Sequence, residues 1–205
     1  MLDSRANGTE FIYTDETNFG VWTQKTNGRS KKGTRCHRTV ANSHGRNLNI
    51  IMSISSERGL IYWERHGSVT AEVFQQYIEN ISHLVNNNST IIIDNAPCHS
   101  RAHTTQGISI KKLPPYSPFL NAIEEAFSCL KYAIKARIEE LREEVYSTAI
   151  PQAQGITIVR HRQRLLERIA EIINIHLISR GKVIRWDNHI HRYVPQCMNM
   201  LDIVE

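Results

Sequence analysis

The run Thr90–Ile93 limits the fold of this chain more than any other stretch, because all four of its residues are β-branched. Four residues are too few for a stable helix, and a segment that is apolar on both faces must be covered on both sides. The run is therefore predicted to be a buried central strand of an α/β sheet. Asp94 follows it directly, and the residues up to Pro97 then break the strand.

Hydrophobic periodicity predicts further elements on both sides of this strand. They are, in order, a strand over 10–15 that ends near Asp15, a hairpin of strands over 48–54 and 59–63, a helix from Ala71, the strand 90–93, a strand over 107–113, a helix from Ala122 and a helix over 165–177. Thr70 is expected to cap the helix from Ala71. Pro151 and Gly155 mark a break, and Gly181 is expected to end the last helix. This order indicates one mixed sheet with helices packed on it.

The size and composition of the chain exclude several classes of protein. With 205 residues, of which 40% are hydrophobic, the chain suits one domain with a single core. It has no apolar run of about 20 residues and no signal-like N-terminus, so a soluble, intracellular protein is expected. The four cysteines form no C-x-x-C pair, which favours free thiols over a disulfide framework or a zinc knuckle.

Three acidic segments are spread along the chain: YTDETNF around Asp15, IIIDNAPCH around Asp94 and LPPYSPFLNAIEEAF around Glu124. The expected elements place the two aspartates at strand ends and the glutamate in the first turn of a helix. If the two strands are neighbours, both aspartates reach one edge of the sheet, where ligands gather. Three carboxylates on separate elements can hold two divalent metal ions, and hard oxygen ligands suit Mg²⁺ or Mn²⁺. Such a site is equipped to cut and rejoin phosphodiester bonds.

These three motifs carry a resemblance to a known family. From about Glu10 to Ala136 the chain resembles the catalytic domain of mariner-type DNA transposases, which belong to the DDE superfamily and have an RNase H-like fold. The resemblance implies an α/β fold of the retroviral-integrase-like kind: a mixed five-stranded sheet flanked by helices, with a helical C-terminal extension. It places the catalytic domain at residues 1–145, with a basic insertion at about 20–46, and the extension at 146–205, packed on the same domain.

The resemblance also implies an activity. Asp15, Asp94 and Glu124 would be the catalytic and metal-binding residues, with two Mg²⁺ or Mn²⁺ ions as cofactors. They would cleave a phosphodiester at a transposon end, and the freed 3′ hydroxyl would attack target DNA. DNA is therefore the implied partner, together with a second copy of the chain in a homodimer. Nuclear location follows from this substrate if the host is eukaryotic, and cytoplasmic location otherwise.

Each carboxylate has an alternative interpretation. Asp15 can serve only to end a strand, with Glu16 on the opposite face as the rival ligand. Asp94 can start a turn, although a carboxylate after four β-branched residues needs polar partners at the sheet edge. Glu124 stands three residues after Asn121, the spacing of a capping box, and Glu125 is its local rival.

The motifs contain further polar residues that are expected to support the site: Asn95, His99 and Asn121. Cys98, His99 and His103 also form a small cluster of the kind that binds zinc. The sequence offers no fourth ligand for it, so a structural role for His99 is favoured.

The segment between Thr17 and Ser56 contains no acidic residue. Its cations predict an attraction to polyanions, and the resemblance makes this segment an insertion that reaches along DNA. The candidate phosphate contacts are Lys31, Lys32, Arg35, Arg38 and Arg46. The alternative is a solvated basic loop that keeps the protein in solution.

The sequence departs from the family in three ways. It leaves no room before Asp15 for paired helix-turn-helix modules, its segment between Asp94 and Glu124 is short, and Ala122 and Phe119 replace a proline and an acidic residue. Three hypotheses follow. The chain is a transposase-derived DNA endonuclease that lacks its DNA-recognition modules, a catalytically decayed module for DNA binding or dimerisation, or another RNase H-like nuclease that acts on RNA–DNA hybrids.

Overall fold

The computed structural model describes residues 8–21, 28–37, 47–104, 107–115, 117–173 and 176–192. Its elements are β1 (Phe11–Phe19), β2 (Leu48–Ser55), β3 (Gly59–His66), α2 (Ala71–Ser82), β4 (Thr90–Ile93), η1 (Pro97–His99), β5 (Ser109–Lys112), η2 (Pro118–Leu120), α3 (Ala122–Glu140), α4 (Arg142–Tyr146), α5 (Ala149–Ala153), α6 (Ile158–Ala170) and α7 (Arg180–His191). Within these ranges, no helix is long and apolar enough to cross a membrane.

The chain divides into two compact units, which are described separately. The first comprises Met1–Thr17, Asn49–Cys129 and Asn174–Glu205, and the second comprises Asn18–Leu48 and Leu130–Ile173. The sheet lies in the first unit except for the ends of β1 and β2. The domain boundary that the sequence suggests at residue 145 stays a prediction.

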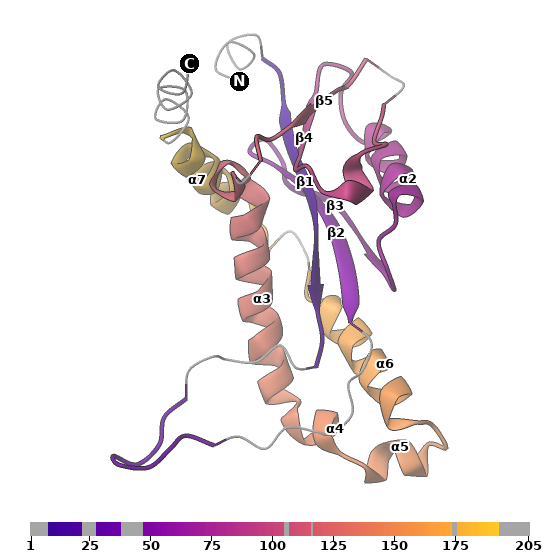
Figure 1. Ribbon diagram of the computed structural model, residues 1–205, viewed down its shortest axis with the longest axis vertical. Coiled ribbons are helices and arrows are strands. Elements are labelled where there is room, and N and C mark those ends of the chain that lie inside the picture. Colours follow the sequence, from indigo (N-terminus) through magenta and orange to yellow (C-terminus); the bar gives the residue numbers. More distant parts are fainter. Residues whose placement is uncertain are drawn as a thin grey trace. The chain divides into compact units, whose positions relative to one another are not determined.

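The described residues form a mixed five-stranded sheet with the strand order β3-β2-β1-β4-β5 (Figure 1). β1 pairs with β4 and β4 with β5 in parallel, whereas β2 and β3 form the antiparallel hairpin. The four residues of β4 are all buried, as expected for a β-branched run inside a sheet. The predicted α/β, five-stranded mixed sheet flanked by helices is thus confirmed.

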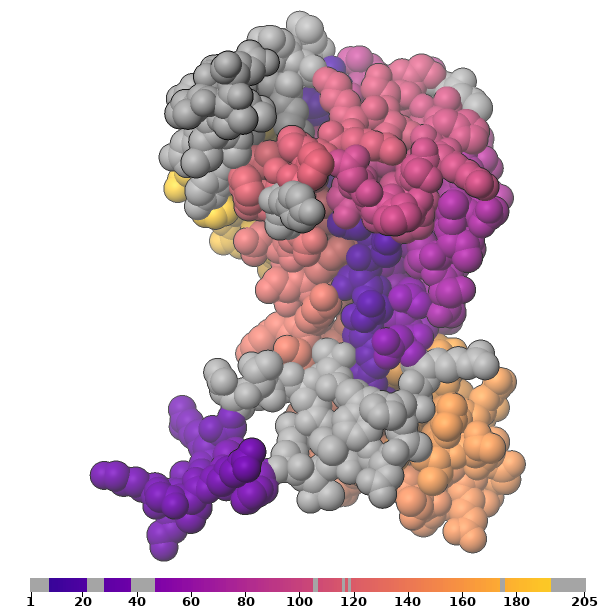
Figure 2. All heavy atoms as spheres, in the orientation of Figure 1, coloured from indigo at the N-terminus to yellow at the C-terminus, as the bar shows by residue number. Residues whose placement is uncertain are grey.

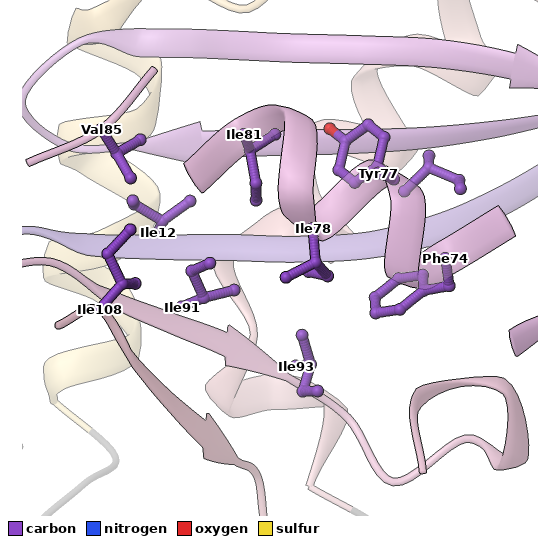
Figure 3. Close-up of a cluster of buried hydrophobic side chains, with 10 residues drawn as sticks. Ile12, Phe74, Tyr77, Ile78, Ile81, Val85, Ile91, Ile93 and Ile108 are labelled. Carbon is purple, nitrogen blue, oxygen red and sulfur yellow. The ribbon is translucent and has the colours of Figure 1, made fainter. Parts of the chain in front are cut away.

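One face of the sheet is covered by α2. Its N-cap is Thr70, whose side chain accepts a hydrogen bond from the Val73 N–H, as the sequence predicts. Figure 3 shows the core between this helix and the sheet, where side chains of α2 meet isoleucines of β1 and β4. The cluster comprises Ile12, Ile51, Phe74, Tyr77, Ile78, Ile81, Val85, Ile91, Ile93 and Ile108. Burial of each of these side chains contributes about 1.5–3 kcal/mol before entropy is counted.

The opposite face of β1 is turned toward α7. Successive strand residues point to opposite faces, so Tyr13 points away from the α2 side that Ile12 joins. The Tyr13 hydroxyl donates a 2.7 Å hydrogen bond to the buried Asp187 of α7. Asp15 follows two residues later and shares the face of Tyr13, whereas Glu16 shares the face of Ile12.

The second unit contains α4, α5, α6 and the later part of α3. The side chains of α6 join it to α4, because His161 Nε2 lies 3.1 Å from the Glu144 carbonyl and Arg162 Nε donates to the Val145 carbonyl. Arg162 is buried although it carries a charge, and these carbonyl contacts account for its position.

The strand that contains Asp15 is longer than predicted. β1 continues to Phe19, because Thr17 and Phe19 are buried while Asn18 is exposed, which extends the two-residue period past Asp15. Asp15 therefore lies within a strand that runs on beyond the end of β4.

Two predictions about the C-terminal helices are wrong. Pro151 does not break the chain but lies in the first turn of α5, where a missing backbone N–H costs no helical hydrogen bond. The break lies instead at Gly155, which has a positive φ of 63° and follows the end of α5. Gly181 does not end a helix but stands in the first turn of α7, after the N-cap Ser179. The preceding helix, α6, instead begins after the capping Thr157 and ends at Ala170.

Candidate active site

The two predicted aspartates meet at one edge of the sheet. β1 and β4 are parallel with Tyr13 paired to Ile92, so two residues further on Asp15 is level with Asp94. Glu124, in the first turn of α3, joins them in a pocket of about 380 Å³. The pocket is lined by Asp15, Asp94, Asn95, Ala96, Leu113, Pro114, Pro115, Ser117, Asn121 and Glu124. All of these residues belong to the first unit.

Asp15 is the most buried of the three carboxylates, with 7% of the residue exposed. Its Oδ1 accepts a 2.8 Å hydrogen bond from the Glu16 N–H, and its Oδ2 accepts one of 3.2 Å from Asn121 Nδ2. Burial, followed by the charges of Asp94 and Glu16, raises the pKa of Asp15 to about 8. The charge of His99 only partly offsets these effects, and a cation in the pocket would offset them further.

Asp94 is more open, because 46% of its side chain is exposed. Its Oδ1 accepts a 2.8 Å hydrogen bond from the Ala96 N–H, which fixes the carboxylate across the turn after β4. The next residue, Asn95, donates from Nδ2 to the Leu113 carbonyl and so joins the ends of β4 and β5. Asn95 thus ties β4 to the end of β5, and Asn121 ties the start of α3 to Asp15 of β1.

Glu124 lines the pocket, whereas its rival Glu125 is not among the lining residues. In the described part of the chain, two sets of acidic, histidine and cysteine groups have ligand atoms that all lie within 4.8 Å of one another. One set joins Asp15, Asp94 and His99, and the other joins Glu16, Cys98 and His99. Glu124 belongs to neither set. The ligand atoms of Asp15 and Asp94 therefore form a close group with His99 and not with Glu124.

His99 connects these two sets. The residue has no exposed surface, and its ring packs on Phe74 with the ring centroids 3.9 Å apart. Its Nε2 lies 2.7 Å from Glu16 Oε2, and its Nδ1 lies 2.6 Å from Asp94 Oδ1. Burial disfavours the imidazolium, but the hydrogen bond and charge of Glu16, then the charges of Asp94 and Asp15, raise the pKa of His99 above its usual value.

Glu16 is the residue that the sequence interpretation missed. Burial opposes its ionisation, but the hydrogen bond and charge of His99 lower the pKa of Glu16. The Cys98 thiol donates to its other oxygen at 3.2 Å, and burial together with this bond raises the pKa of Cys98 to about 12. The cysteine is therefore a neutral thiol that helps to hold Glu16. The only sequence signal for Glu16 is its place next to Asp15, which suggested a rival ligand instead of a partner for His99.

The donor set fits divalent cations. Carboxylate oxygens are the ligands that Mg²⁺ and Mn²⁺ prefer, and the pocket brings two aspartates and a glutamate together. One buried polar atom beside them, Nδ1 of His99, makes no hydrogen bond with the described residues.

A family model described as DDE superfamily endonuclease matches residues 10–145. The chain belongs to the DDE superfamily endonucleases. The resemblance of its three motifs to this superfamily is thereby confirmed. No curated protein matches the sequence of this DDE endonuclease.

Solved structures of the Mos1 transposase share its fold. The mariner Mos1 paired end complex with Mg matches with a TM-score of 0.58 at 16% identity, over 95% of this chain and 58% of that chain. The Mos1 mariner paired end complex with Mn has a TM-score of 0.54 at 16% identity, over 95% and 59% of the two chains. The pre-cleavage Mos1 transpososome has a TM-score of 0.53 at 17% identity, over 93% and 59%. The DDE endonuclease chain thus spans about three-fifths of the length of the Mos1 chains.

Three of the candidate DNA contacts are among the described residues of this DDE endonuclease, and they lie in its second unit. Lys31, Lys32 and Arg35 are exposed, and they belong to the segment 28–37, which is coloured purple in Figure 2. We call these three residues the exposed basic segment. Arg38 and Arg46 lie outside the described residues.

Proposed function

We propose that this chain is the catalytic domain of a mariner-type transposase, a metal-dependent endonuclease that cleaves DNA and joins the new end to a target. The observation that carries the proposal is the convergence of Asp15, Asp94 and Glu124 on one pocket, in a chain that matches the DDE superfamily endonuclease model. Mos1, whose fold the chain shares, has been solved as paired end complexes with Mg and with Mn.

Asp15, Asp94 and Glu124 would hold two divalent ions, Mg²⁺ or Mn²⁺. When bound, such ions stabilise the negative charge on the attacking and leaving oxygens of a phosphodiester. The chain's own residues fix the ligands in advance: Asn121 and the Glu16 N–H orient Asp15, and the Ala96 N–H orients Asp94. No protein nucleophile is required, because water and then a 3′ hydroxyl attack the phosphorus.

DNA and a second copy of the chain are the partners in this proposal. The exposed basic segment would contact phosphates, which positions DNA without reading its sequence. The paired end complexes in which Mos1 has been solved support the proposal of a paired assembly on DNA. The proposal also includes transposon ends and target DNA as substrates, and location in the nucleus if the host is eukaryotic.

Cleavage of supercoiled plasmid in Mn²⁺ tests the proposal. The wild type is expected to nick the plasmid, and Asp94→Ala is expected to lose that activity, because it removes a metal ligand that does not belong to the core. An RNA–DNA hybrid of the same sequence serves as the competing substrate, and preference for the hybrid would assign the chain to another class of RNase H-like nuclease. Equal nicking by the wild type and Asp94→Ala would point to a contaminating nuclease and remove the proposal.

A second candidate is a catalytically decayed module that binds DNA or dimerises. The observation that favours it is the place of Glu124, which lines the pocket without joining the close set formed by Asp15, Asp94 and His99. The two candidates differ in whether the protein cleaves DNA in the presence of Mn²⁺. The decayed module binds DNA through its basic segment in the presence of Mn²⁺ and leaves the plasmid intact.

A further inference from the structure

The buried nitrogen Nδ1 of His99 lies beside the two aspartates of the pocket. It is 2.6 Å from Asp94 Oδ1, yet it makes no hydrogen bond with the described residues, so the carboxylate oxygen stands off the axis of the nitrogen lone pair. The ligand atoms of Asp15, Asp94 and His99 all lie within 4.8 Å of one another. A buried polar atom without a hydrogen bond is costly, and among the described residues the close approach of Asp94 Oδ1 is the contact that offsets this cost.

The other side of the ring is held in the way that metal-binding histidines are held. A histidine that ligates a metal almost always gives its second ring N–H to a carboxylate or carbonyl, which fixes the tautomer. Here His99 Nε2 lies 2.7 Å from Glu16 Oε2, and Phe74 packs against the ring. Donation of the Nε2 proton to Glu16 leaves Nδ1 as the nitrogen with a free lone pair, on the side of Asp15 and Asp94.

The position of Asp94 Oδ1 away from the lone-pair axis of His99 Nδ1 also fits an ion that both atoms bind. Two ligands of one ion would lie close together without a hydrogen bond between them, because each would direct its lone pair at the ion. A hydrogen bond from Nδ1 to Asp94 would instead need the oxygen close to the nitrogen lone-pair axis. We propose that His99 Nδ1 is a ligand of the divalent ion held by Asp15 and Asp94, with Glu16 fixing the ring through Nε2. The inference rests on the proposed function, because it assigns a further ligand to the same metal site.

A nitrogen ligand changes which ion the site prefers. Mg²⁺ is bound almost entirely through oxygen, whereas imidazole ligands suit transition metals. The site is therefore selective for Mn²⁺ over Mg²⁺ compared with a site made of carboxylates alone. His99→Gln removes the nitrogen and is expected to weaken Mn²⁺ binding by roughly 10-fold or more, and Mg²⁺ binding by less.

Pulsed electron paramagnetic resonance of bound Mn²⁺ tests this ligand directly, because the electron spin echo is modulated by a nitrogen bound to the metal. The full chain is loaded with Mn²⁺ alone, once at natural isotope abundance and once with ¹⁵N-labelled histidine. The wild type is expected to show ¹⁴N modulation that is replaced by ¹⁵N modulation on labelling. His103→Gln, which changes an exposed histidine four residues away, is the matched control and keeps the modulation. His99→Gln loses it, and Asp94→Asn loses the bound Mn²⁺.

The outcomes separate this inference from the function on which it rests. Mn²⁺ that binds to the wild type, depends on Asp94 and shows no nitrogen modulation overturns the histidine ligand and leaves the carboxylate site intact. Modulation that persists in His99→Gln overturns it as well, since another histidine is then the source. A wild type that binds no Mn²⁺ in an Asp94-dependent way overturns both the ligand and the proposed function. Because the wild-type spectrum decides the first outcome, the test does not depend on the folding of a variant at buried His99.

Discussion

The carboxyl of Asp15 is held where its negative charge is unfavourable, so Asp15→Asn is expected to stabilise the metal-free protein. The folded protein raises the pKa of this group from 3.8 to about 8, through burial and the charges of Asp94 and Glu16. A raised pKa contributes stability that is fully present below pH 3.8 and is lost as the pH rises toward about 8. The wild type without metal therefore becomes less stable over this window, and a neutral side chain at position 15 does not.

The magnitude follows from the linkage between pKa and stability. At pH 7 the window corresponds to about three pKa units, or about 4 kcal/mol, at roughly 1.4 kcal/mol for each unit. This is an upper limit for Asp15→Asn, because asparagine places an amide donor where Oδ2 accepts from Asn121. We expect a gain of about 1–3 kcal/mol at pH 7–8, which falls toward zero near pH 4.

Urea unfolding with a chelator at several pH values between 5 and 8 measures this difference. Asp94→Asn is the matched control and is expected to stabilise the protein less, because 46% of the Asp94 side chain is exposed. Mn²⁺ at 100 times its dissociation constant is expected to stabilise the wild type by about 2.7 kcal/mol and Asp15→Asn hardly at all. The reasoning is refuted if the difference between Asp15→Asn and the wild type does not grow with pH.

Three further predictions concern other parts of the chain. Alanine at all three cations of the exposed basic segment is expected to lower the slope of log affinity against log salt by about 2.7, measured by fluorescence anisotropy with duplex DNA, and an unchanged slope contradicts the phosphate contacts. Glu124→Gln is expected to reduce Mn²⁺-dependent cleavage by about 100-fold or more, whereas Glu125→Gln, outside the pocket, stays near wild type, and the reverse order would exchange their roles. Gly59→Ala is expected to destabilise by about 1–3 kcal/mol, because φ is +82° and a Cβ would lie 2.6 Å from the Arg180 backbone nitrogen; Gly33→Ala, with φ +84° and open space around it, is expected to cost less in the same urea assay.

The central part of the fold could be predicted because its signals are local. Four β-branched residues identified β4, and helical spacing after a capping Thr70 identified α2. Because β1 pairs with β4 in parallel, the register of the two strands brings Asp15 and Asp94 to the same level. The third motif, and not the register, placed Asn121 beside the site, although not its hydrogen bond to Asp15.

The remaining features depend on contacts that local patterns do not contain. Glu16 and His99 are 83 positions apart, and only the packed sheet and η1 bring their side chains to 2.7 Å. β1 passes Asp15 because Thr17 and Phe19, on the same face of the strand, are also buried. Gly181 suggested a helix end, but the first turn of α7 tolerates glycine, since its N–H groups lack partners within the helix.

The proposed function requires a divalent metal site at the edge of the sheet between β1, β4 and α3. Anomalous diffraction from crystals of the full chain with Mn²⁺ tests this claim most directly. We expect manganese peaks within bonding distance of the carboxylates of Asp15 and Asp94, with Glu124 completing a two-ion site. Manganese peaks only elsewhere on the protein, with these carboxylates left without an ion, would contradict the claim.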